Sequence, residues 1–596
     1  MSNQIATPTE IPEVGQVQFA LVADCGSSLT RVALIEQVDN TYRFVARSEA
    51  PTTVEPPWSD ISVGFLHAVS QLEEIVGRPL LDEQGHLIIP TEGTAGVDLL
   101  VVTSSAAQPL RVVLAGLVRE ISVASLERAA QTSYVRVLDT IAPSGADLHQ
   151  RDNERIRRIR QHRPDVVWVA GGTDGGASQP VLELVETVAL ACSLMDSAPQ
   201  PDLVYAGNAA LRAQIAEILG DEIAYIVVDN VRPSLDVENL TTAEMVFDRL
   251  YQKRKLGNLP GIHALQAWST GPILPTARAF GYLVNYLDYR YEGPKGVLGV
   301  DVGSANTVVA ASFNGRLSMT VRTDLGVGHN ALATVESRGI EAIQRWLPFP
   351  AEPGEILTVA HNQVLWPATI PLEKRELIIQ QAIAREALRA VLETARAAWR
   401  RANVPFHRRL APQVEPIIAR GTVLTRAPRP GQAALMLLDA LEPVGITTLL
   451  LDPYDLAPGL GAVATLKPLV AVDTLDGGAF VNLGTVISPI GRARPGDIVL
   501  RIKLTYESGG GYEVDVRYGT LELHPLPPGE KARLELRPRR GIDVGRGGPG
   551  RGGGPIEIPP SLLGLIVDAR GRPLRLPANP GARREQVKRW MRDMGV

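Results

Sequence analysis

The sequence predicts an α/β protein with two related halves around a cleft, followed by a mainly β domain at the C-terminal end. Three observations lead to this fold class. Apolar strand-like runs alternate with helix-like segments, as in largely parallel sheets covered by helices. One short polar turn between apolar strands occurs twice, far apart in the sequence. After about residue 468, short strand-like runs separated by Gly and Pro turns replace the helical pattern.

The first polar turn follows an apolar strand and reads Asp24-Cys-Gly-Ser-Ser-Leu-Thr30. Gly26 lacks the Cβ that would hold a phosphate away from the backbone, and the hydroxyls of Ser27, Ser28 and Thr30 can donate to anionic oxygens. Asp24 ends the strand, where a carboxylate could hold the water shell of Mg²⁺. Asp-Gly combinations also end many ordinary hairpins, so this turn alone does not establish a phosphate site.

A second turn of the same pattern reads Asp301-Val-Gly-Ser-Ala-Asn-Thr307, again between apolar strands. The two turns align as D-x-G-S-[SA]-x-T, so Gly303, Ser304 and Thr307 are the counterparts of residues in the first turn. A phosphate clamp made of two facing hairpins needs two such turns, and the pair is therefore far more specific than either copy. The pair resembles the phosphate loops of the actin, sugar-kinase and heat-shock chaperone ATPase superfamily, in which two ribonuclease H-like halves surround a nucleotide cleft.

The overall composition is that of a soluble globular protein with several domains. A chain of 596 residues exceeds the roughly 250–300 residues over which a single hydrophobic core usually extends. The formal charge of −5 is too small to predict a nucleic acid or a membrane as partner. With only two cysteines, no evident signal peptide and no apolar run of 18 residues, the sequence predicts a cytoplasmic protein.

The N-terminal part of the chain is predicted as a tail followed by an α/β unit. Residues 1–16 are polar and contain Pro, and we expect a flexible tail there. Residues 17–145 form the first α/β unit, which carries the first phosphate hairpin. Its further elements are expected as a third strand at 42–46, a helix at 61–77, a strand at 98–103 and a long helix that starts near Pro109.

Three more segments follow. Residues 146–295 are an α/β region with turns at Gly171-Gly-Thr-Asp-Gly-Gly176 and Tyr205-Ala-Gly-Asn208. Residues 296–465 are the second α/β unit, with the second phosphate hairpin and a glycine turn at Gly421 and Thr422. Residues 466–596 are the β-rich domain, whose Gly/Arg-rich loop at 541–555 matches no phosphate-binding loop and is interpreted as a linker or partner contact.

Two glycine turns are candidates for ligand binding. Gly171, Gly172, Thr173 and Asp174 follow a buried strand, and such a turn can bind a phosphate or a ribose, or be an ordinary loop. The order of hairpin, helix, strand and glycine turn runs from the first hairpin to Gly171, and again from the second hairpin to Gly421. This repetition is consistent with two homologous halves around a cleft.

Six segments, taken together and in order, resemble one family within the superfamily. This family is the MutL-type accessory proteins encoded beside adenosylcobalamin-dependent glutamate mutase, which are unrelated to the mismatch-repair protein of that name. The resemblance covers most of residues 17–465. The segments are Asp24-Cys-Gly-Ser-Ser-Leu-Thr30, Thr103-Ser-Ser-Ala106, Ala170-Gly-Gly-Thr-Asp-Gly-Gly176, Tyr205-Ala-Gly-Asn208, Asp301-Val-Gly-Ser-Ala-Asn-Thr307 and Leu435-Met-Leu-Leu-Asp-Ala-Leu-Glu-Pro-Val-Gly-Ile-Thr-Thr448.

The resemblance implies an actin-like, Mg²⁺-dependent ATPase that assists or reactivates a cobalamin-dependent mutase, in the manner of a chaperone, through ATP-driven closure of the cleft. Its partners would be the mutase subunits, and a homo-oligomer is compatible with it. Asp24 and Asp301 would be catalytic, orienting Mg²⁺ and the attacking water. Residues expected to bind ATP are Gly26, Ser27, Ser28, Thr30, Gly171, Gly172, Thr173, Asp174, Gly303, Ser304, Thr307, Gly421 and Thr422, the last two facing the adenosine.

This sequence departs from the family pattern in two places. The second phosphate loop usually has paired glycines before the hydroxyls, whereas here Gly303 is followed by Ser304 and Ala305. The basic Gly-rich C-terminal region has no counterpart in the resemblance.

Three other functions stay open. A small-molecule kinase of the same fold would transfer phosphate to an added metabolite. An iron–sulfur activator of radical dehydratases would need cysteines at a subunit interface, which Cys25 in the turn and Cys192 in an apolar helix do not suit. A nucleotide-binding scaffold or filament without turnover is suggested by Ala305.

Overall fold

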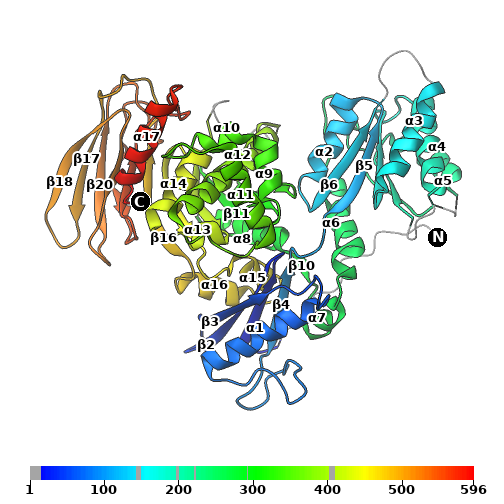
Figure 1. Cartoon of the computed structure of the whole chain (residues 1–596), viewed down its shortest axis with the longest axis horizontal. Helices are drawn as coiled ribbons and strands as arrows, with labels where there is room; N and C mark the ends of the chain where they lie inside the picture. Colours follow the sequence, from blue (N-terminus) through cyan, green and yellow to red (C-terminus); the bar gives the residue numbers. More distant parts are fainter. Residues whose placement is uncertain are drawn as a thin grey trace. The chain divides into compact units, whose positions relative to one another are not determined.

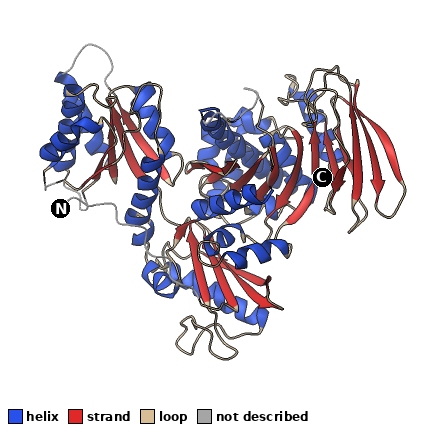
Figure 2. Cartoon of the chain, turned by 180° about the vertical axis from the view of Figure 1, so that it is seen from behind, coloured by secondary structure: helices blue, strands red, loops and turns tan. Residues whose placement is uncertain are grey.

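The computed structural model describes residues 15–142, 149–195, 200–220, 223–291, 293–401, 404 and 410–596. These residues fall into two compact units (Figures 1 and 2). The inserted unit is Ala106–His263, and the core unit combines the described residues up to Ser105 with Ala264–Val596. The predicted boundary between 145 and 146 therefore lies within the inserted unit, and the predicted tail lies outside the described residues up to residue 14.

The first lobe of the core unit is a five-stranded sheet with the order β3-β2-β1-β4-β10. Strands β1, β2 and β3 form an antiparallel meander, β4 pairs parallel to β1, and helix α1 packs on β2 and β3. The bounds are β1 Phe19–Cys25, β2 Leu29–Val38, β3 Thr41–Pro51, α1 Ile61–Val76, β4 Leu99–Ser104 and β10 Leu274–Pro275.

The second lobe repeats this order as β13-β12-β11-β14-β15. Helix α12 precedes β14 as α1 precedes β4, and α9, α10 and α11 are added between β13 and α12. The prediction of two related halves is thereby confirmed. The bounds are β11 Gly296–Val302, β12 Thr307–Phe313, β13 Arg316–Arg322, α9 Ala331–Arg338, α10 Ile340–Gln344, α11 Pro353–Leu365, α12 Lys374–Arg401, β14 Val414–Arg420, α13 Thr422–Thr425, α14 Pro430–Leu441 and β15 Gly445–Leu451.

The repeat ends at a different place from the one predicted. The strand that pairs parallel to β1, as β14 pairs parallel to β11, is β4, which ends at Ser104. The turn at Gly171 instead follows β7 (Val166–Ala170) of the inserted unit, so it is not the counterpart of Gly421. The sequence order was misleading because the whole inserted unit lies between β4 and β10.

Two helices join the lobes. Helix α8 (Thr276–Tyr291) follows the last strand of the first sheet but packs on β11, β12 and β13 of the second. Helix α15 (Ala457–Val463) follows β15 and packs on β1 and β4 of the first sheet, as well as on α8. Where they meet, a Cβ on Gly461 would lie 1.9 Å from the carbonyl oxygen of Ala279, so glycine allows the close crossing.

The C-terminal region is mainly β, as predicted, but it is continuous with the second lobe. Strands β16, β22 and β19 extend the second sheet beyond β15 to a total of eight strands. A four-stranded sheet, β18-β17-β20-β21, shares an apolar core with the extended sheet. The bounds are α16 Pro468–Asp476, β16 Val481–Ser488, β17 Ile498–Tyr506, β18 Gly511–Arg517, β19 Leu521–His524, β20 Ala532–Pro538, β21 Ile556–Ile558, β22 Leu565–Asp568 and α17 Pro580–Asp593.

The inserted unit is a separate five-stranded parallel sheet with the order β6-β5-β7-β8-β9. The predicted helix near Pro109 is wrong, because Leu110–Gly116 is strand β5, which is buried at all but one position. The other bounds are α2 Ala124–Ala130, β6 Val135–Ile141, α3 His149–His162, α4 Gln179–Ser193, β8 Asp202–Tyr205, α5 Arg212–Leu219, β9 Tyr225–Val227 and α6 Thr241–Arg254. In the described parts of both units, no helix has the length and apolar character needed to cross a membrane.

Candidate functional site

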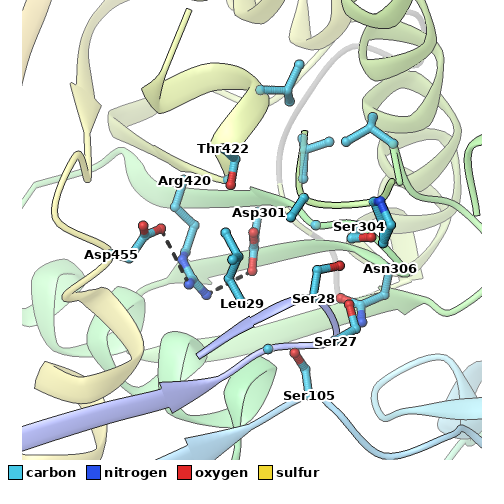
Figure 3. Close-up of a pocket in the computed structure, with 18 of the residues that line it drawn as sticks. Ser27, Ser28, Leu29, Ser105, Asp301, Ser304, Asn306, Arg420, Thr422 and Asp455 are labelled. Atoms are coloured by element: carbon cyan, nitrogen blue, oxygen red, sulfur yellow. Dashed lines mark hydrogen bonds and ion pairs between the residues drawn. The ribbon is translucent and has the colours of Figure 1, made fainter. Parts of the chain in front are cut away.

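A pocket of about 80 Å³ lies between the two lobes of the core unit (Figure 3). Both predicted phosphate turns line it, together with the glycine turn after β14 and the segment Pro367–Ile370 before α12. Of the predicted site residues, nine line the pocket: Asp24, Gly26, Ser27, Ser28, Asp301, Gly303, Ser304, Gly421 and Thr422.

The two phosphate turns have the same backbone geometry. The N–H of Gly26 donates to the carbonyl of Leu29 over 3.0 Å, and that of Gly303 donates to the carbonyl of Asn306 over 2.9 Å. A Cβ on either glycine would lie 2.9 Å from that same carbonyl oxygen. The sequence pattern therefore identified two equivalent tight turns in which a side chain has no room.

Thr30 and Thr307 do not line the pocket. Both are fully buried, Thr30 Oγ1 lies 2.9 Å from Thr52 Oγ1, and Thr307 Oγ1 donates to the Leu325 carbonyl over 3.0 Å. Thr30 is the second residue of β2 and Thr307 is the first of β12, and each ties its strand to a neighbouring segment. In this structure their hydroxyls hold the hairpins in place, and their role as phosphate ligands stays a prediction.

His329 links the two phosphate turns. Its Nδ1 lies 3.3 Å from Ser28 Oγ in the first lobe and 2.9 Å from Ser304 Oγ in the second, and its backbone N–H donates to Ser304 Oγ. Burial lowers its pKa, so the imidazole is neutral at pH 7. Sequence reasoning missed this residue, because a lone histidine in a Gly-Val-Gly-His loop carries no recognisable pattern.

Arg420 lies between the two predicted catalytic carboxylates. It is paired with Asp301 in the register of β11 and β14, and its Nη1 lies 3.0 Å from Asp301 Oδ2. Its Nη2 lies 2.8 Å from Asp24 Oδ2, which belongs to the other lobe. Burial opposes the charge of Arg420, but Asp301 and Asp24 outweigh it and raise its pKa above the ordinary value. Sequence reasoning missed this residue too, because the contact depends on strand register.

The remaining bonds of this cluster come from neighbouring elements. Asp24 Oδ1 accepts from Thr103 over 2.8 Å and from Thr276 over 2.7 Å. Arg31 of the first lobe donates to Thr422 Oγ1 over 3.0 Å and lies 3.0 Å from Asp455 Oδ2. Figure 3 shows Arg420 between Asp301 and Asp455, with dashed lines to both. Polar bonds therefore cross between the lobes at several points around the pocket.

The predicted Mg²⁺ ion does not fit Asp24 and Asp301 as they are held. The guanidinium of Arg420 takes the place between the carboxylates where a bridging ion would lie, and both oxygens of Asp24 already accept hydrogen bonds. In the ranges that the structure describes, no cluster of three or more His, Cys, Asp or Glu side chains is arranged to hold a metal.

The other end of the pocket is less polar. Gly421 has φ 106°, and a Cβ on it would lie 2.2 Å from the Val302 carbonyl, so the turn after β14 lies directly against the second hairpin. Val423 and Ile370 line this pocket together with Gln380, which is 3% exposed. The Nε2 of Gln380 donates to Gln363, whereas its buried Oε1 has no hydrogen-bond partner.

The turn at Gly171, Gly172, Thr173 and Asp174 belongs to the inserted unit, and it is not among the residues that line the pocket. There its polar groups join neighbouring loops: Asp174 Oδ1 accepts from the N–H of Ala209 and from Asn230 Nδ2, each over 2.9 Å. Its role in nucleotide binding stays a prediction.

Asp452 gives the core unit a testable pH dependence. Its carboxylate accepts the N–H groups of Leu456 and Ala457 at the start of α15, while burial and then Asp455 raise its pKa to about 7. The folded pKa of Asp452 thus lies above its unfolded value of about 3.9. The contribution of Asp452 to the free energy of unfolding is therefore complete below about pH 3.9 and is lost as the pH rises through about 7.

We therefore expect Asp452→Asn to flatten the fall in urea midpoint that the wild type shows between about pH 5 and pH 8. Asp476→Asn, at a half-exposed carboxylate paired with Arg290, is the control and should keep the wild-type slope. An unchanged slope in Asp452→Asn would contradict this assignment.

The repeated strand order, the crossing helices and the paired turns define an actin-like protein, a class with two lobes around a nucleotide cleft. The chain belongs to the MutL protein family, whose model matches residues 20–477. Protein MutL of Clostridium tetanomorphum is 25% identical over 347 residues, which cover 55% of this chain and 68% of that protein.

Solved structures give weaker similarities. A nucleotide-free acetone carboxylase aligns with 84% of this chain and 81% of its own at 9% identity and a TM-score of 0.34. The ATP-dependent caprolactamase of Pseudomonas jessenii aligns with 83% and 81% at 14% identity and a TM-score of 0.32. The gluconate kinase of Lactobacillus acidophilus aligns with 78% and 93% at 8% identity and a TM-score of 0.29.

Proposed function

We propose that this chain is an actin-like ATPase that assists or reactivates a cobalamin-dependent mutase of the glutamate mutase type through nucleotide-driven movement of its lobes. The observation that carries the proposal is the pair of equivalent phosphate turns that line one pocket between the lobes of a MutL-family chain. Membership of the family supports the mutase as partner, and the pocket supports the nucleotide.

The polar end of the pocket suits the phosphates. Ser27, Ser28 and Ser304 present hydroxyls, and Gly26 and Gly303 let the backbone approach an anion closely. The end with Gly421, Thr422 and Val423 suits the nucleoside. ATP would thus contact both lobes at once.

The size of the pocket connects binding to movement. Ligand pockets usually have volumes of about 300–1,000 Å³, and this one has about 80 Å³, enough for a phosphate group but not for ATP. In this proposal the lobes separate to admit the whole nucleotide, which would break contacts such as that of His329 with Ser28. Binding and hydrolysis would therefore change the angle between the lobes, and that change would act on the mutase.

The chemical step needs little covalent participation by the protein. Hydroxyl and backbone donors from the two turns would orient the terminal phosphate, while Asp24 and Asp301 would fix Arg420, and Asp301 would polarise the attacking water. We assign no magnesium ion to these two carboxylates, because Arg420 already bridges them.

The first experiment measures ATP binding and hydrolysis by the purified chain, with and without a cobalamin-dependent glutamate mutase. Hydrolysis that increases with the mutase supports the proposal. Transfer of phosphate to an added metabolite would favour a kinase instead, and binding without turnover would favour a scaffold. The iron–sulfur alternative is disfavoured because Cys25 and Cys192 are buried and burial raises the pKa of each thiol to about 12.

Single hydroxyls test the phosphate turns. We expect Ser28→Ala and Ser304→Ala each to weaken ATP binding by about tenfold or more, because a hydrogen bond to a charged group contributes about 1.5–3 kcal/mol. Calorimetric titration measures this, and Ser508→Ala, at an exposed turn of the C-terminal region, is the matched control. Unchanged affinity in both pocket variants would place the phosphates elsewhere.

A further inference from the structure

The carboxylates at the base of the pocket are neutralised by the protein itself. Asp24 and Asp301 are 5% and 8% exposed, and Arg420 between them is 3% exposed. Two buried carboxylates this close to one guanidinium would repel each other strongly without it. The bridge has hydrogen-bond geometry at both ends, at 2.8 Å and 3.0 Å, and Asp455 adds a third acidic neighbour at 3.8 Å.

This arrangement leaves no place for a second cation between the two carboxylates. Asp24 Oδ1 accepts from two threonines and Oδ2 from Arg420, so neither oxygen is free for an ion. A divalent ion inserted between the carboxylates would meet the guanidinium at close range, and like charges repel strongly in a poorly solvated site. Arginine also keeps its proton under all conditions that a protein experiences, so this positive charge is permanent.

Arg420 also has a donor to spare. Its Nε–H is buried and has no hydrogen-bond partner, and the residue lines the same pocket as Ser28 and Ser304. An unsatisfied buried N–H on a cation is a strong donor for an anionic oxygen. The Nε atom is not exposed to the pocket in this structure, so Arg420 would have to shift to make this bond. The positive charge of the guanidinium, which lines the pocket, acts on a phosphate there without that contact.

We infer that Arg420 is the built-in cation of this site and takes the place of a divalent metal ion between Asp24 and Asp301. It ties the first lobe to the second through Asp24 and supplies the positive charge that faces the phosphates. The phosphate part of this inference rests on the proposed function. The metal part does not, because it concerns only the carboxylates and the guanidinium.

Mn²⁺ alone is the probe for the metal part, with the free ion measured by electron paramagnetic resonance in the absence of nucleotide. The wild type should bind no Mn²⁺ at Asp301, so Asp301→Asn should leave the Mn²⁺ binding of the chain unchanged. Arg420→Gln frees the carboxylates and should gain one site per chain, which binds Mn²⁺ at least about tenfold more tightly than any Mn²⁺ binding by the wild type, and Arg420→Gln/Asp301→Asn should lose it again. Arg537→Gln, at an exposed arginine, is the control.

A wild-type chain that binds one Mn²⁺ ion tightly and loses it in Asp301→Asn overturns the inference. This comparison does not need Arg420→Gln to fold. A folded Arg420→Gln protein that gains no site overturns it as well.

Titration of a non-hydrolysable ATP analogue in excess chelator tests the phosphate part. The wild type should keep its affinity within about threefold of the value in Mg²⁺, and Arg420→Gln should lose about tenfold or more. A collapse of wild-type affinity on chelation contradicts the role of Arg420. Absence of binding with and without Mg²⁺ would instead defeat the proposed function, while the Mn²⁺ result would still decide the metal part.

Discussion

Replacing Asp24 by alanine is expected to abolish ATP turnover and to lower the free energy of unfolding of the core unit by about 3–5 kcal/mol, the usual cost of removing one partner from a buried ion pair. Arg420 would lose its bond to the first lobe, and Thr103 and Thr276 would lose their acceptor. Asp301→Ala is expected to abolish turnover as well, because it removes the other half of the bridge.

Turnover and the urea transition of the core unit are the measurements. Glu74→Ala, at an exposed carboxylate on α1, is the control and should change neither. Normal turnover in both Asp24→Ala and Asp301→Ala would exclude the pocket as the catalytic site.

The second large effect is expected at Asp568, far along the chain from the pocket. Its buried carboxylate lies 2.9 Å from Arg570 Nε and 2.6 Å from Arg572 Nη2. Arg570 also forms an ion pair with Asp439 on α14, over 2.7 Å. Asp568→Asn removes the negative charge that pairs with these buried arginines. We therefore expect the free energy of unfolding to fall by about 3–5 kcal/mol.

The pH dependence has a defined sign. Burial alone would raise the pKa of Asp568, but Arg570 and Arg572 outweigh it and hold the pKa far below its usual range. This stabilisation is present above the unfolded pKa of about 3.9 and is lost as the pH falls toward the folded value. We expect the acid transition of the core unit to become shallower in Asp568→Asn.

An equally short but exposed ion pair provides the matched control. Asp515 lies 2.6 Å from Arg501 on the four-stranded sheet, with side chains 33% and 49% exposed. Asp515→Asn should cost less than about 1 kcal/mol, because exposed pairs contribute little. Equal losses in the two variants would show that burial is not what gives the Asp568 cluster its effect.

The features that the sequence predicted best are those that depend on local chemistry. The turns at Gly26 and Gly303 require glycine for steric reasons that act within four residues, so their pattern could be recognised twice and aligned. The two-lobed fold followed from that alignment, and the change to Gly and Pro turns near residue 468 marked the β-rich region.

The features that it missed depend on contacts between distant segments. Arg420 and Asp24 are 396 positions apart in the sequence, and His329 and Ser28 are 301 apart. No local sequence pattern therefore identifies Arg420 or His329. Leu110–Gly116 was predicted as a helix because a short apolar run does not distinguish a buried parallel strand from a helix. The Gly171 turn was placed in the repeat because a glycine turn after a strand occurs in both units.

Because the C-terminal region shares a sheet with the second lobe, that region moves with the lobe, and its displacement grows with distance from the pocket. Five strand-to-strand steps separate β11, which carries Asp301, from the outer strand β19, a span of about 24 Å at about 4.8 Å per step. A hydrogen-bonded sheet transmits rotation without a hinge, so each degree of lobe rotation about β11 displaces β19 by about 0.4 Å. A lobe rotation of about 10° would therefore move the far edge at β19 by about 4 Å.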